Sequence, residues 1–333
     1  KNKCNGTISL PTGAGKTLVG IMAIQQNPNA TVLIVTPTIH LMLQWKNAIE
    51  KQLGKVEIGL VGGNNNDWDK QIIVGVVNSV REKIFNKDLL ILDEIHRYGG
   101  DVNSLFIQNG QFKSIMGLSA TPERVDDLDE RYFKFAPVIF SMTQDEAVAK
   151  KLLAPYESVS VPIDLSPEDR EAYDNLNDYI KSKFGLFDYN FGAVQASLGW
   201  KTERERIATQ LMRVFQKRKK IIYNAGGKVL VVPEIIQKEL NDTGVVPKTI
   251  VFCELIQTAK AIKKELEEHD FDCESYHSKT PSANRQKILE DFKNDEFDVL
   301  VAVKSLDEGL DVPECEVGII VGGTSVKRQM IQR

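Results

Sequence analysis

The sequence contains few of the residues that build cross-linked, metal-bound or membrane-spanning proteins. Only four cysteines and four histidines occur among 333 residues. The cysteines lie far apart, without the spacing of a zinc site or a disulfide framework, so we interpret them as reduced thiols. No apolar run approaches the roughly 20 residues that cross a bilayer, and no signal peptide is visible. These absences predict an intracellular protein, cytoplasmic or nuclear, without a membrane partner.

The sequence also lacks a strong charge of either sign. Its 42 lysines and arginines are set against 46 acidic residues, which leaves a formal net charge of −4. Nucleic-acid-binding domains are often basic overall, so any such contact must come from a locally basic segment. Hydrophobic residues make up 42% of the chain, which is enough for the cores of the two domains that this length suggests.

A glycine-rich segment near the start is the first functional signal. It lies between a strand-like run at 7–10 and a predicted helix at 16–26. A strand, a glycine-rich turn and a helix N-terminus bind anions, because free backbone N–H groups point at the phosphate. Leu10 stands where the full phosphate-loop pattern has its first glycine, so the alternative is a turn that merely ends a strand. We expect ATP to bind here through Pro11, Thr12, Gly13, Ala14, Gly15, Lys16 and Thr17.

Within this loop, two side chains have distinct expected roles. Lys16 would reach the β- and γ-phosphates, and the Thr17 hydroxyl would bind Mg²⁺. A second signal follows the apolar run 89–92, which has the length of a buried parallel strand. Asp93 would hold Mg²⁺ through water, and Glu94 would orient or deprotonate the attacking water. The predicted catalytic residues are therefore Lys16, Asp93 and Glu94, and the alternative for the acidic pair is a cap on a helix at 94–98.

The order of apolar runs predicts an α/β fold with two parallel sheets. Strand-like runs alternate with helical stretches in the first part of the chain, at 7–10, 32–35, 72–77, 89–92 and 115–118. The pattern returns at 249–253, 273–276, 298–303 and 317–321, with helices at 256–268 and 282–293. Such alternation favours parallel sheets covered on both faces. We expect an ATP-binding domain at 1–150, a connector with a helical insertion at 151–245, and a second α/β domain at 246–333.

The predicted insertion carries the local positive charge that the whole chain lacks. Residues 166–240 read as helical after a capping pattern that begins at Ser166. Positions 201–220 hold eight basic and two acidic residues. One hypothesis is a helical insertion that grips DNA phosphates, and the alternative is a solvated helix face. The candidate contacts are Lys201, Arg204, Lys217 and Arg218.

Taken together, the motifs resemble those of superfamily 2 helicases, DEAD/DEAH-like motors with two RecA-like domains. The resemblance covers nearly the whole chain and rests on ordered motifs. In sequence order these are Pro11–Thr17, Thr36–Thr38 with Gln44-Trp45, Asp93–His96, Gly117–Pro122, Ile250–Cys253, Val303–Pro313 and Gln329–Arg333. The Gln-Trp pair, the run Ser119–Arg124 and the run Asp307–Pro313 resemble the XPB-type and type III restriction branch. That branch consists mostly of double-stranded DNA translocases and helicases, and XPB-type members carry a thumb-like helical insertion. Their Arg-Glu-Asp element after the third motif is not matched by Glu123–Asp126.

The resemblance implies further site residues. ATP would lie between the two RecA-like domains, with Gly309, Asp311 and Arg333 contributing from the second. Thr36, Pro37, Thr38 and Ser79 would contact nucleic acid. Coupling between the two sites would fall to His96, Ser119, Thr121 and Gln332. For the serines and threonines the alternative is helix capping.

The function that follows is an ATP- and Mg²⁺-dependent DNA helicase or double-stranded DNA translocase. The alternatives are an ATP-gated DNA-binding scaffold within a repair, restriction or defence complex with protein partners, and an RNA helicase, because backbone contacts do not distinguish the sugar. The chain begins just before the phosphate loop and ends at Arg333, short of the later arginines of the last motif. We therefore expect a fragment of a longer protein whose 333 residues turn over ATP weakly.

Overall fold

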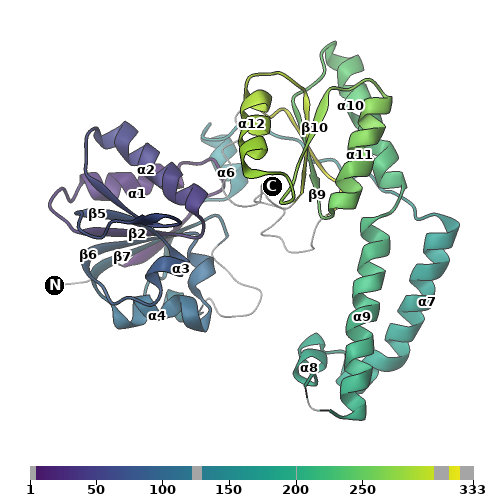
Figure 1. The fold of residues 1–333 in the computed structure, drawn as a ribbon, viewed down its shortest axis with the longest axis horizontal. Helices are drawn as coiled ribbons and strands as arrows, with labels where there is room; N and C mark the ends of the chain where they lie inside the picture. The colour runs from purple at the N-terminus through teal and green to yellow at the C-terminus, as the bar shows by residue number, and fades with distance from the viewer. Residues whose placement is uncertain (1–4, 122–129, 200, 304–314, 323–333) are drawn as a thin grey trace. The chain divides into compact units, whose positions relative to one another are not determined.

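The computed structural model describes residues 5–121, 130–199, 201–303 and 315–322. The chain divides into two compact units, the first ending at Ser158 and the second beginning at Val159. Each unit contains a sheet with helices packed on it (Figure 1). The predicted α/β class with two parallel sheets is confirmed, and in the first sheet a single two-residue edge strand runs antiparallel.

The first unit is built on eight strands in the order β4-β3-β5-β2-β6-β7-β1-β8. The strands are β1 (Gly6–Ser9), β2 (Val32–Thr36), β3 (Ile58–Gly62), β4 (Asn65–Asn66), β5 (Ile72–Val76), β6 (Asn86–Asp93), β7 (Gln111–Ser119) and β8 (Val138–Ser141). The helices are α1 (Lys16–Gln25), α2 (Ile39–Leu53), α3 (Val77–Val80), the 3-10 turn η1 (Ile95–Tyr98), α4 (Asp101–Asn109), α5 (Glu130–Phe133) and α6 (Gln144–Ala149).

Both faces of this sheet are covered, and the strand sequences show why. Side chains alternate between faces along a strand, so β2 sends Ile34 to one core and Leu33 to the other. Figure 1 shows α1 and α2 over one face and α3 and α4 over the other. Trp45 and Met42 of α2 are fully buried on the first face. A continuous apolar run such as β2 is therefore what a two-sided core requires.

Every strand expected in this unit forms, and three further strands, β3, β4 and β8, were not predicted. The β3 segment contains glycine at two of its five positions, which weakens a strand signal because glycine is depleted in strands. The four residues of β8 are all exposed, so this edge strand is held mainly by its pairing with β1.

The second unit contains a four-stranded parallel sheet in the order β10-β11-β9-β12. Its elements are β9 (Thr249–Cys253), β10 (Cys273–Tyr276), β11 (Val299–Val303), β12 (Val317–Ile320), α10 (Gly227–Thr243), α11 (Ile256–Glu268) and α12 (Ser282–Lys293). Ile236 of α10 and Ile262 of α11 are buried with Val251 and Val301 in one core. Figure 1 shows α10 and α11 on one face of the sheet and α12 on the other.

A pair of long helices precedes this sheet in the second unit. They are α7 (Pro167–Phe184) and α9 (Glu203–Tyr223), joined through the 3-10 turn η2 (Gly185–Phe187) and α8 (Phe191–Ala196). Ser166 caps α7 as expected, because its side chain accepts a hydrogen bond from the Asp169 N–H at 3.1 Å. α7 and α9 lie side by side (Figure 1) around buried Ile180 and Leu211. Phe187, Tyr179, Phe184 and Phe215 contribute to the small core of this segment.

None of the helices within the described ranges combines the length and apolar character of a membrane span.

Candidate functional site

The loop after β1 has the backbone of an anion site. Gly13 and Gly15 adopt φ angles of 82° and 92°, which glycine tolerates better than other residues. The first intrahelical bond of α1 runs from the Val19 N–H to the Gly15 carbonyl, at 3.1 Å. The N–H groups of Lys16 and Thr17 therefore have no partner within the helix and are available to a phosphate beyond its N-terminus.

Sheet order brings the predicted catalytic residues to one edge. β6, β7 and β1 are adjacent and parallel, so their carboxyl ends meet at the same edge. β1 leads into the phosphate loop, β7 ends at Ser119 and β6 ends at Asp93. The Lys16 ammonium lies 3.4 Å from the Leu10 carbonyl oxygen, and its charge opposes the rise in pKa that burial causes at Asp93 and Glu94. The structure thus gathers the predicted lysine and the two acids.

Asp93 is buried and held by a tryptophan. Its Oδ2 accepts a hydrogen bond from Trp45 Nε1 at 2.8 Å, and only 5% of the residue is exposed. Burial raises the pKa of this carboxyl, while Trp45 and Lys16 act in the opposite direction. The indole is itself fixed, because a Cβ added at Gly20 would lie 2.5 Å from Trp45 Cη2. Trp45 therefore orients Asp93, a role that the sequence did not predict.

Glu94 combines an unusual backbone with a perturbed carboxyl. Its φ of 53° and ψ of 58° are left-handed, a conformation that costs energy for a residue other than glycine. The side chain is 20% exposed. Burial raises the pKa of Glu94 to about 7; Asp93 adds to the rise, and Lys16 and the Ser119 hydrogen bond oppose it. A carboxyl with a pKa near neutrality is suited to proton transfer. Sequence reasoning offered a helix cap as the alternative, but no side-chain cap forms here.

Two of the four predicted coupling residues, His96 and Ser119, lie beside Glu94, and a third, Thr121, contacts Ser119. Ser119 Oγ lies 3.3 Å from Glu94 Oε2 and 3.0 Å from His96 Nδ1, and it accepts a hydrogen bond from the Thr121 N–H at 3.2 Å. His96 Nδ1 is also 3.4 Å from Glu94 Oε2. The hydroxyl of Ser119 thus joins the ends of β6 and β7 to the start of the next segment. The fourth residue, Gln332, lies outside the described residues.

Tyr98 is a further supporting residue that sequence reasoning missed. Its hydroxyl lies 2.8 Å from the Val35 carbonyl oxygen and 2.9 Å from the Asp93 carbonyl oxygen. The ring is fully buried. The two hydrogen bonds of its hydroxyl link the ends of β2 and β6 to η1, which contains Tyr98. A local pattern offers no signal for such a contact, since Val35 is distant in the sequence.

The predicted nucleic-acid contacts of the first unit differ in their surroundings. Thr36 is fully buried, and its Oγ1 donates to the Thr38 carbonyl at 3.1 Å. Thr38 caps α2 by accepting from the Leu41 N–H at 3.3 Å, which matches the capping alternative. Pro37 is half-buried beside it, and Ser79 is exposed on α3.

The four basic residues predicted to contact DNA differ in whether their side chains already have partners. Arg218 donates to Asn177 Oδ1 of α7 at 2.6 Å. The Arg204 guanidinium lies 5.0 Å from the centre of the Phe187 ring. Both side chains are therefore engaged within the helical pair, whereas Lys201 and Lys217 are exposed.

One face of α9 carries a row of basic side chains that we call the basic stripe. Its members are exposed and follow the helical period, and they are Arg206, Arg213, Lys217 and Lys220. They lie on the side of α9 opposite buried Ala208 and Leu211. At about 1.5 Å per residue the stripe is about 21 Å long. Sequence reasoning found the charge run but selected only Lys217 from this face.

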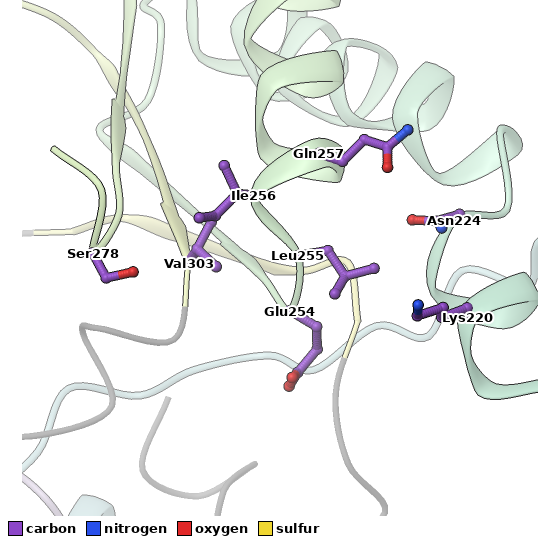
Figure 2. Close-up of a pocket in the computed structure, with 8 residues that line it drawn as sticks. All are labelled: Lys220, Asn224, Glu254, Leu255, Ile256, Gln257, Ser278 and Val303. Atoms are coloured by element: carbon purple, nitrogen blue, oxygen red, sulfur yellow. The ribbon is translucent and has the colours of Figure 1, made fainter. Parts of the chain in front are cut away.

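The last residue of the stripe lines a pocket at the second sheet. The pocket has a volume of about 600 Å³. Figure 2 shows Lys220 and Asn224 on one side of it and Ser278 on the other, with Glu254 and Leu255 after β9 between them. Asn224 Oδ1 also accepts a hydrogen bond from Thr258 Oγ1 of α11 at 3.2 Å, which ties α9 to this edge. Ligands of open α/β sheets bind at the carboxyl ends of the strands, where this pocket lies.

The predicted nucleotide contacts Gly309, Asp311 and Arg333 lie outside the described residues, as do Pro122 and the segment Glu123–Asp126. Within the described parts of the chain, no group of three or more histidine, cysteine or acidic residues has the geometry of a metal site. Thr17 and Asp93 carry oxygen atoms of the kind that Mg²⁺ prefers when it keeps several waters.

A phosphate loop and an acidic pair at one edge of a parallel sheet, with a second parallel sheet later in the chain, define a P-loop ATPase of the helicase type. Comparison with known proteins agrees. Residues 1–124 match the family described as "Type III restriction enzyme, res subunit", and residues 228–333 match the "Helicase conserved C-terminal domain".

Relatives and a solved structure narrow the class. The DNA 3'-5' translocase XPB2 of Sulfurisphaera tokodaii is 33% identical over 98% of this chain and 73% of its own length. The DNA 3'-5' helicase XPB of Kineococcus radiotolerans is 25% identical over 98% of this chain and 53% of its own length. The helicase domain of Hef from Pyrococcus furiosus, at 17% identity, shares the fold with a TM-score of 0.59 over 99% of this chain and 89% of its own.

The chain belongs to the XPB-type branch of the superfamily 2 helicases. Its two sheets match the two RecA-like domains expected of that fold, and its family is one of nucleic-acid-dependent ATPases.

Proposed function

We propose that this chain hydrolyses Mg²⁺-ATP at the carboxyl edge of the first sheet and uses the cycle to move along double-stranded DNA. The observation that carries the proposal is that Lys16, Asp93, Glu94 and Ser119 lie together at the carboxyl ends of three adjacent strands. The names of the XPB relatives support DNA as the polymer. A DNA substrate in turn implies a place of work in the cytoplasm or the nucleus.

Each group at this edge has a role in the proposed hydrolysis. The N–H groups at the start of α1 and the Lys16 ammonium would hold the phosphates. Bound Mg²⁺ would neutralise phosphate charge, and Thr17 and Asp93 would hold it. Glu94 would take a proton from the attacking water. By the family resemblance, Gly309, Asp311 and Arg333, which lie outside the described residues, would also contact the nucleotide.

The basic stripe is the proposed DNA contact of the second unit. Its four charges lie on one exposed helix face in a chain of net charge −4, so attraction for phosphates is local. Lys220, the last residue of the stripe, also lines the pocket at the second sheet. Pro37, Thr38 and Ser79 would contact the backbone on the first unit, with Lys201, Arg204 and Arg218 flanking the stripe.

ATP hydrolysis by the full chain with duplex DNA, single-stranded DNA or RNA tests the polymer. We expect duplex DNA to stimulate hydrolysis most. Stimulation by RNA alone would refute the proposal in favour of an RNA helicase, and hydrolysis indifferent to all three polymers would refute translocation.

A pair of neutral substitutions tests the stripe. Arg213→Gln with Lys217→Gln should weaken duplex binding and reduce the slope of log Kd against log salt concentration by about two, since each lost phosphate contact removes about 0.9. The matched control is Lys181→Gln with Lys264→Gln, because these side chains are 78% and 76% exposed and lie on α7 and α11. Equal slopes for the two double variants would remove the stripe from the interface.

A further inference from the structure

The chain leaves the first unit through a segment that is fixed at both ends. α6 begins with a capping box, in which Thr143 Oγ1 accepts from the Glu146 N–H at 3.2 Å and Glu146 Oε2 accepts from the Thr143 N–H at 2.8 Å. At its far end, the N–H groups of Leu152 and Leu153 both point to the Ala147 carbonyl, at 2.9 and 3.3 Å. The turn after α6 is therefore a defined structure.

This turn places Leu153 against the phosphate loop. A Cβ added at Gly13 would lie 3.0 Å from Leu153 Cδ2, so the two residues are in contact as they stand. Leu153 is half-buried, whereas its neighbour Leu152 is 51% exposed. Upstream, the segment is anchored beside the loop, because the Met142 N–H donates to the Ser9 carbonyl at 2.9 Å.

We propose that Leu153 is a positioning residue of the nucleotide site, which braces the phosphate loop at Gly13. A loop made of glycines in left-handed conformations has few side chains of its own to hold its shape, and Leu153 supplies apolar contact from outside. The ligand whose binding depends on this brace is a nucleoside triphosphate. The inference rests on the phosphate-binding role proposed above for the loop.

Leu153 also lies close in sequence to the point where the chain enters the second unit. Residues 154–158 connect it directly to the second unit, which begins at Val159. Within the proposal, a displacement of this connector would act first on the segment that carries Leu153.

The test compares Leu153→Ala with Leu152→Ala in the full chain, using a fluorescent, non-hydrolysable ATP analogue and Mg²⁺. We expect Leu153→Ala to raise the Kd for the analogue about fivefold, because truncation removes contact from a half-buried leucine. The KM for ATP should rise in parallel while kcat stays within twofold. Leu153→Met should restore tight binding, since methionine fills a similar volume. Leu152→Ala should bind as the unaltered chain does.

Three outcomes decide whether Leu153 positions the nucleotide site. A Kd for Leu153→Ala within twofold of that for Leu152→Ala overturns the proposal, and so does a lowered Tm with unaltered Kd, which would make the contact structural only. Lys16→Ala separates this failure from that of the phosphate loop itself. If Lys16→Ala binds the analogue normally, the loop is not the nucleotide site and the premise falls.

Discussion

Replacing Glu94 by glutamine should abolish ATP hydrolysis and at the same time stabilise the first unit. Burial raises the pKa of Glu94 from 4.5 to about 7. Each unit of pKa shift corresponds to about 1.36 kcal/mol, so the ionised carboxylate costs the folded state about 3 kcal/mol above pH 7. Glutamine keeps the shape and an acceptor for the Ser119 hydroxyl without the charge. The residue proposed for catalysis is thus held in place at the expense of stability.

The sign of the effect sets its pH dependence. A carboxyl whose pKa is higher in the folded state binds its proton more tightly there, so the stability of the unaltered chain declines as pH rises from about 4.5 to about 7. Glutamine does not titrate. The stability difference between Glu94→Gln and the unaltered chain should therefore be small at pH 5 and reach its full size at pH 8.

Urea unfolding at pH 5 and pH 8 in the presence of a metal chelator measures this difference. Tryptophan fluorescence suits the first unit, which contains Trp45 and Trp68. Glu82→Gln is the matched control, because that side chain is 82% exposed and should show no such change. Binding of ATP should survive in Glu94→Gln. A difference at pH 8 no larger than that at pH 5 would refute the raised pKa of Glu94, and normal hydrolysis would remove Glu94 from catalysis.

Trp45→Phe should lower the free energy of unfolding by about 1–3 kcal/mol, because it leaves the buried Asp93 Oδ2 without its hydrogen-bond donor. Trp68→Phe, whose lost bond is exposed, should cost less in the same urea titration, and equal losses would argue against a special role for Trp45. Ser119→Ala should move the rise of DNA-stimulated ATP hydrolysis to higher pH, because the serine hydrogen bond lowers the pKa of Glu94. An unshifted pH profile would contradict that contribution.

Much of the fold and the chemistry of the site can be predicted from local sequence patterns. The phosphate loop lies between a strand and a helix as its sequence indicates, and the run 89–92 carries Asp93 to a strand end. These features depend on neighbours within a few residues, such as glycines that permit a positive φ or an apolar run that forms a buried strand. Strand β8 escaped prediction because its exposed residues depend on a partner strand, and β3 because glycine weakens its signal.

Contacts between distant segments could not be predicted in this way. The bond from Trp45 to Asp93, the brace of Leu153 on Gly13 and the position of Ser119 beside Glu94 all arise when separate strands and helices pack together. Local sequence sets the residue types available at the phosphate loop and the acidic pair. Burial, and with it the pKa of Glu94 near neutrality, depends on the surrounding segments, because desolvation is a property of everything packed around a group.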